Sequence, residues 1–154
     1  MSSINPTHAT DATACPLCTD TGGHEVYSTP LWRVVRVEDS AFPAFYRLIW
    51  QSHVAEFSDL SAADRQACME AVTGIERALR TALQATKINL ATLGNVVPHL
   101  HWHVVARFDW DSHFPNPIWG TPLRSLAVPA VQLLALDLAE LDERVRQALA
   151  ELSA

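Results

Sequence analysis

The stretch Pro98–Ala106 reads PHLHWHVVA, so that three histidines alternate with apolar residues. Successive side chains of a β-strand point to opposite faces, and this alternation therefore places His99, His101 and His103 on one face, about 6.6 Å apart. The apolar side chains between them then face a core. On a helix the histidines would spread around the axis. Because a buried imidazole needs a hydrogen-bond partner, a row of three indicates chemistry rather than packing.

The composition is that of a globular protein. The chain has 154 residues, of which 49% are hydrophobic and 18% charged, and this length suits one domain with a substantial core. We expect a flexible tail over residues 1–14 and a single domain over residues 15–154. The small, polar N-terminus lacks a signal-peptide core and no apolar run suits a membrane helix, which predicts a cytoplasmic protein with no membrane partner. A net charge of −6 without a basic block argues against nucleic-acid binding.

Hydrophobic periodicity predicts further elements on both sides of the histidine strand. Two β-rich runs joined by a turn indicate an antiparallel hairpin, and Ser61 is placed to cap a helix with one apolar face. An aromatic and proline-rich loop over 108–129 precedes a second amphipathic helix. The predicted elements are a hairpin (31–37 and 44–50), a helix (61–85), a strand (87–93) and a second helix (130–152). This order indicates an α+β domain with an antiparallel sheet.

Two kinds of site use a row of histidines. In the first, His99, His101 and His103 bind one metal ion and leave an open position for water, as in a zinc hydrolase. In the second, the middle imidazole is a nucleophile and its neighbour donates a proton. Imidazole suits phosphoryl or nucleotidyl transfer because it is a good nucleophile when neutral near pH 7. The spacing alone is compatible with both.

The longer stretch Gly94–Val105, GNVVPHLHWHVV, resembles the His-x-His-x-His signature of the histidine triad (HIT) superfamily. The preceding strand, the capped helix and the hairpin also stand in the order that this family uses, and the resemblance extends over about residues 15–107. It implies a HIT-like α+β fold with an antiparallel sheet of about five strands and two main helices. That sheet requires one more short strand near residues 24–27. The resemblance also implies a homodimer.

HIT proteins hydrolyse or transfer nucleotides at the α-phosphate of nucleoside polyphosphates, phosphoramidates or acyl-nucleotides. The resemblance therefore implies a hydrolase of the diadenosine polyphosphate hydrolase or nucleoside phosphoramidase type, with a nucleotide as its substrate. In it, His101 is the nucleophile that forms a nucleotidyl-histidine, and His103 contacts the phosphate or the leaving-group oxygen. Gly94, Asn95 and Glu38 are the implied substrate-binding residues. Glu38 stands near the place of a ribose-binding residue, although a solvated turn carboxylate explains it equally well.

The chain departs from the family pattern just before the triad. Family members commonly have Gly-Gln-Ser/Thr there, with the hydroxyl touching phosphate, whereas this chain has Gly94-Asn95-Val96. Asn95 can replace an amide donor, but Val96 has no hydroxyl. Two alternatives to the HIT hydrolase therefore stay open. They are a nucleotide-binding regulatory module with a structural zinc and little turnover, and the open-site metalloenzyme.

Cysteine usage indicates a metal or redox site rather than a disulfide framework. The chain has three cysteines, an odd number with one close pair, Cys15-Pro16-Leu17-Cys18. Cys68 lies on the apolar face of the first predicted helix and is expected in the core. A redox role for the close pair requires a thioredoxin-like unit, which the surrounding sequence does not indicate. Two free thiols on a mobile arm are the plainer alternative.

Some HIT relatives also have an N-terminal Cys-x-x-Cys. In them a histidine just after the second hairpin strand and the first triad histidine complete the metal site. The resemblance thus implies a closed, structural zinc site in this chain. Two further histidines, His24 and His8, compete for a ligand position. The implied ligands are Cys15, Cys18, His53 and His99.

Overall fold

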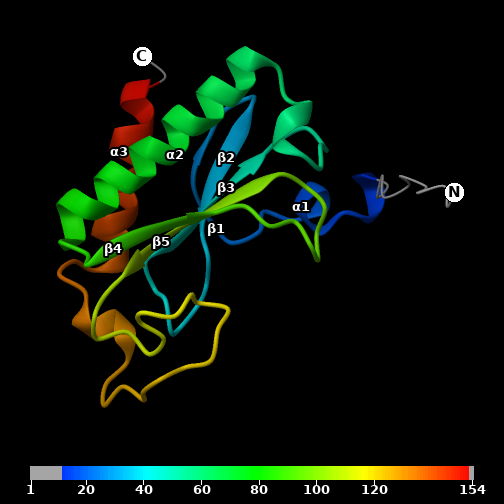
Figure 1. Ribbon diagram of the computed structural model, residues 1–154. Coiled ribbons are helices and arrows are strands. Elements are labelled where there is room, and N and C mark those ends of the chain that lie inside the picture. The colour runs from blue at the N-terminus through cyan, green and yellow to red at the C-terminus, as the bar shows by residue number, and fades with distance from the viewer. Residues whose placement is uncertain (1–11, 153–154) are drawn as a thin grey trace, which may run out of the picture.

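The computed structural model in Figure 1 describes residues 12–152. The predicted tail lies outside these residues except for Ala12–Ala14, which form a 3-10 turn, η1. The other elements are α1 (Pro16–Thr19), β1 (His24–Ser28), β2 (Trp32–Arg36), β3 (Phe45–Trp50), η2 (Phe57–Asp59), α2 (Ala62–Leu83), β4 (Lys87–Ala91), β5 (His101–Arg107), η3 (Ala130–Leu133) and α3 (Leu138–Leu152). The predicted α+β class, with five strands and two main helices, is confirmed, and β1 is the additional short strand.

The strands form one antiparallel sheet in the order β1-β2-β3-β5-β4. In its centre, β3 and β5 pair so that Ile49 lies opposite His101 and Arg47 lies opposite His103. Directly opposed residues of an antiparallel pair point to the same face. The two histidines therefore share a face with Arg47, while Trp102 points to the other face and packs against the main core, as predicted.

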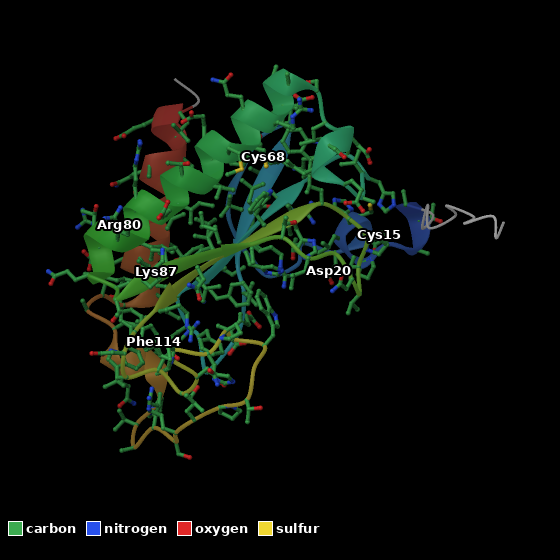
Figure 2. All side chains as sticks on the ribbon, in the orientation of Figure 1. Cys15, Asp20, Cys68, Arg80, Lys87 and Phe114 are labelled. Atoms are coloured by element: carbon green, nitrogen blue, oxygen red, sulfur yellow. The ribbon has the colours of Figure 1, made fainter. Side chains whose placement is uncertain are left out.

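The helices α2 and α3 cover one face of the sheet, as Figure 1 shows. The backbone N–H of Asp64 donates to the Ser61 side chain at 3.1 Å, which is the predicted N-cap. Cys68, labelled in Figure 2, is fully buried in the core between α2 and the sheet. The whole predicted apolar face of α2 is buried: Cys68, Val72, Ile75, Leu79 and Leu83.

The predicted first residue of the last helix is wrong. α3 begins at Leu138 rather than at residue 130, and Ala130–Leu133 form only a 3-10 turn. Asp137 explains the difference, because its side chain accepts a hydrogen bond from the N–H of Glu140 at 2.8 Å and caps a new helix. Of the apolar stripe expected for this helix, Leu141 and Val145 are buried, whereas Leu152 is 45% exposed. The buried apolar residues of α3 are Leu141, Val145 and Leu149.

The prediction for the histidine row also needs correction. β5 begins at His101, so His99 precedes the strand instead of lying within it. Pro98 has no N–H for a sheet ladder, and the N–H of His99 donates locally to the carbonyl of Val97 at 2.8 Å. The backbone is thus turned away from sheet pairing at His99. His101 and His103 therefore share one face of β5, and His99 lies just before the strand.

Two segments without strands cover parts of the opposite face of the sheet. Residues 15–23 place Cys15 and Leu17 against β2 and β3, in a small core of their own. The loop over residues 108–129 places Ile118 against β3 and β5 in another. His101 and His103 lie on this face as well. Within residues 12–152, no helix has both the length and the apolar character needed to cross a membrane.

Candidate functional site

Four side chains from three separate parts of the chain meet near the start of β5. Cys15 immediately precedes α1 and Cys18 lies in it, His53 follows β3, and His99 precedes β5. Their ligand atoms all lie within 4.8 Å of one another, and Cys15 and His99 are buried. Figure 2 labels Cys15 in this region, next to α1. The structure thus brings together the complete predicted ligand set.

The distances within this cluster match a tetrahedral zinc site. Zinc bonds of about 2.0–2.1 Å to nitrogen and about 2.3 Å to sulfur require tetrahedral edges of about 3.3 Å between two nitrogens and about 3.6 Å between nitrogen and sulfur. The Nδ1 atoms of His53 and His99 are 3.3 Å apart. Cys18 Sγ lies 3.3 and 3.4 Å from them, and Cys15 Sγ lies 3.5 Å from His99 Nδ1. The residues fit a closed zinc site, as predicted, and the ion would be structural there.

The surroundings of the cluster support this assignment. His99 Nε2 lies 2.6 Å from the carbonyl oxygen of Trp50 and donates to it, which leaves Nδ1 as a ligand. Burial also lowers the pKa of His99 and favours the neutral form that binds metal. Of the competing histidines, His24 lies 3.5 Å from Asp142, outside the cluster, and His8 lies outside the described residues.

His101 is the first residue of β5 and is buried. Its Nδ1 lies 2.6 Å from the carbonyl oxygen of His99 and donates to it. That hydrogen bond fixes the tautomer, so that the lone pair lies on Nε2. Burial lowers the pKa of His101, which favours the neutral imidazole. The arrangement holds a neutral imidazole in a fixed orientation, on the face of the sheet opposite the two main helices.

His103 lies two residues further along the same face and is also buried. Its ring centroid lies 4.9 Å from that of His101, 5.4 Å from Phe45 and 5.2 Å from Trp119. Burial lowers the pKa of His103 to about 3, with smaller contributions from His101 and the Arg47 cation. Its Nδ1 is buried and has no hydrogen-bond partner among the described residues. His103 is therefore a neutral imidazole with unused hydrogen-bonding capacity.

The predicted substrate-binding residues lie in two loops. Gly94 has φ of 74° and needs glycine for this left-handed backbone, in the loop that leads into β5. Asn95 is exposed there, and Val96 is 93% exposed. Glu38 is exposed in the turn between β2 and β3. The structure does not bring Glu38 into contact with the histidines within the described residues.

Two side chains next to the histidines were missed in the sequence. Arg47 is the single charged residue of an otherwise apolar strand, Phe45–Trp50, and that exception was the available signal. Trp119 belongs to the 108–129 loop, and nothing in the local sequence links it to His103. The start of this loop is held by Asp111, which accepts hydrogen bonds from Arg107 and from two loop N–H groups.

Comparisons with known proteins agree with this geometry. The crystal structure of a histidine triad protein from Bradyrhizobium japonicum is 27% identical and superposes with a TM-score of 0.67, covering 84% of this chain and 92% of that one. A histidine triad protein from Sinorhizobium meliloti is 25% identical, with a TM-score of 0.69 over 90% of this chain and 99% of that one. A Zn-bound histidine triad family protein from Mycobacterium smegmatis shares the fold at 20% identity and a TM-score of 0.61, covering 93% and 98%.

No match was found among curated proteins. The HIT domain, however, matches residues 20–110, which is more than half of the chain and includes the hairpin, the capped helix and both strand histidines. The chain therefore belongs to the HIT family.

Proposed function

We propose that this protein is a nucleotide hydrolase or nucleotidyl transferase that acts at the α-phosphate of nucleoside phosphoramidates or nucleoside polyphosphates through His101. The observation that supports this most directly is the 2.6 Å contact between His101 Nδ1 and the His99 carbonyl. It leaves the Nε2 lone pair available on a neutral, oriented ring. Family membership supports the same reading.

In the proposed first step, His101 Nε2 attacks the α-phosphorus with its lone pair. The new P–N bond forms as the bond to the leaving group breaks, and the leaving group departs with that electron pair and takes up a proton from solvent. The carbonyl of His99 faces Nδ1 and stabilises the positive charge that develops on the ring. In the second step, water attacks the phosphorus, the P–N bond breaks, and the nucleotide leaves while the water proton goes to solvent. A different acceptor in place of water makes the reaction a transfer.

The neighbouring residues take supporting parts in this proposal. His103 donates a hydrogen bond to the phosphate or to the leaving-group oxygen, because a neutral ring with a pKa of about 3 is a donor rather than a reservoir of protons at neutral pH. Gly94 and Asn95 contribute to phosphate binding, and Glu38 to ribose binding. Zinc held by the four ligands would fix the backbone at His99, whose carbonyl orients His101.

The open-site metalloenzyme is disfavoured by the orientation of two rings. His99 Nδ1 faces the cysteines, and His101 Nδ1 is engaged with a backbone carbonyl. The rings of the row therefore do not converge on one ion. One observation favours the nucleotide-binding module with little turnover: Val96 supplies no hydroxyl to a phosphate. Turnover measurements separate this alternative from the enzyme.

The test replaces His101 by Ala, with His113→Ala as a control at a histidine in the loop beyond β5. Turnover of adenosine phosphoramidate and diadenosine tetraphosphate should fall by several orders of magnitude in the His101 variant, while its folding and zinc content stay unchanged. His113→Ala should keep its activity. Undiminished turnover without His101 would exclude the proposed mechanism. A folded wild-type protein that binds both compounds without converting them would establish the binding module.

A further inference from the structure

Four arginines lie in strands of the described sheet, and three of them have a full set of partners. Arg36 forms an ion pair with Asp142, and Arg107 with Asp111. The guanidinium of Arg33 donates to three backbone carbonyls and one side chain, namely Leu17, Asp20, Thr21 and Gln51. These arginines are structural, because each connects the sheet to a neighbouring segment. The fourth, Arg47, differs from them.

Arg47 is a largely buried cation with few hydrogen-bond partners. Its Nε is buried and has no hydrogen-bond partner within residues 12–152. Its Nη1 reaches the carbonyl of Gly22 only at 3.5 Å, the outer limit for a hydrogen bond. The guanidinium carbon lies 5.9 Å from the centroid of the Phe45 ring. Burying a charge without good partners is costly, so such an arrangement indicates a function for the group.

The position of Arg47 identifies that function. It lies opposite His103 in the β3–β5 register, and side chains so paired start about 4.5–5.5 Å apart. His103 Nδ1 is a second buried polar atom without a partner among the described residues. The nearby carboxylates are already engaged, Asp20 with the N–H of Gly22 and Asp111 with Arg107. Within residues 12–152, no carboxylate forms an ion pair with Arg47.

We propose that Arg47 is a phosphate-binding residue of this site. Nε and one terminal nitrogen donate a pair of hydrogen bonds to non-bridging oxygens of the phosphate that His101 attacks. This geometry suits guanidinium, which binds phosphate with two parallel N–H donors. Arg47 thereby supplies from β3 the contact that a hydroxyl at position 96 would supply from the loop before the triad. The inference rests on the proposed function for the identity of the phosphate.

The experiment measures binding rather than turnover, using zinc-loaded protein and two probes, AMP and adenosine. The variants are Arg47→Met, which keeps the length without the charge, and Arg47→Lys, which keeps the charge without Nε. Arg80→Met, at an exposed position of α2 (Figure 2), controls for the loss of one positive charge. Two charge-assisted hydrogen bonds predict that Arg47→Met weakens AMP binding by about 100-fold or more. Adenosine binding should stay unchanged, and Arg47→Lys should be intermediate for AMP.

Each outcome decides the inference. If Arg47→Met binds AMP as tightly as the wild type does, the assignment of Arg47 is wrong. If Arg47→Met does not fold, Arg47→Lys is compared with the wild type instead. The assignment is then wrong if the ratio of AMP to adenosine affinity is the same in both proteins. Failure of the wild type to prefer AMP over adenosine also overturns it. A nucleotidyl-His101 trapped in the same preparation would still support the proposed function, so the two failures are distinguishable.

Discussion

His103 is expected to make the fold sensitive to acid. Its pKa is about 3 in the folded protein, because the ring is buried beside His101 on β5 and the Arg47 cation on β3, while Ala91 on β4 and Trp119 add no charge. In the unfolded chain the ordinary value of 6.5 applies. As pH falls below 6.5, only the unfolded state binds this proton, and stability that is present above pH 6.5 is progressively lost.

The loss attributable to His103 should be about 1 kcal/mol between pH 7 and pH 5.5. Urea unfolding at both pH values measures it, with zinc content checked in each sample. Asparagine cannot take up this proton. The unfolding free energy of His103→Asn should therefore fall by about 1 kcal/mol less between pH 7 and pH 5.5 than that of the wild type. An identical pH dependence for the two proteins would show that His103 is not held neutral by its surroundings.

Some residues of the site could be predicted from the sequence, and others could not. The four residues of the zinc cluster could be predicted because short motifs and a family resemblance specify their relative order. The nucleophilic role of His101 stays a prediction from the same resemblance. Arg47 and Trp119 could not be predicted, since their proximity to His103 depends on strand register and on a loop whose start is held by Asp111. Such contacts join residues that are far apart in the sequence, and no local period encodes them.

The first segment, residues 15–23, should depend on zinc for its place on the sheet. It packs there with a small apolar core and accepts hydrogen bonds from Arg33. Replacing Cys15 by Ser should lower the zinc content from about one ion per chain to nearly none, because a closed tetrahedral site needs all four ligands. Cys68→Ser is the matched control, since Cys68 is a buried core thiol away from the cluster.

Loss of the metal should also lower the melting temperature. Binding at about a thousandfold excess over Kd contributes about 4 kcal/mol, which corresponds to about 8–16 °C for a domain of this size. Elemental analysis and thermal unfolding of the two variants measure both effects. The assignment would be refuted if Cys15→Ser kept its zinc while His101→Ala lost it, because the metal would then lie in the histidine row.

The elements differ in how well the sequence predicts them. α2 was predicted almost to its ends, because Ser61 caps it and one apolar stripe extends over its length. The start of α3 was not, since residues 130–136 are almost all apolar and lead directly into the apolar residues of the helix. There the cap at Asp137 outweighs the pattern, and the preceding residues form a 3-10 turn and extended backbone.

The strand order places β4 at one edge of the sheet, where its outer side pairs with no other strand of residues 12–152. Leu90 and Leu93 lie on and just after this strand and are 38% and 51% exposed. Because an apolar edge strand is a template for pairing with another chain, we expect β4 to join two copies into the homodimer that the family resemblance implies.

Light scattering after gel filtration tests this assembly. The wild type should have twice the mass of the chain, and the double variant Leu90→Lys, Leu93→Lys should have the mass of one chain. Leu133→Lys, at an exposed leucine of η3, is the control and should stay dimeric. A monomeric wild type, or a dimer that survives both edge charges, would exclude β4 as the interface.

Trapping the covalent intermediate tests the central claim most directly. Wild-type protein is mixed with a nucleoside phosphoramidate labelled at its phosphorus, quenched in alkali within one turnover, digested and analysed by mass spectrometry. The account predicts one nucleotidyl group per site, stable to base and labile to acid, on the peptide that contains His101, and none in His101→Ala. Rapid turnover without any labelled protein, or a label on a residue other than His101, would contradict it.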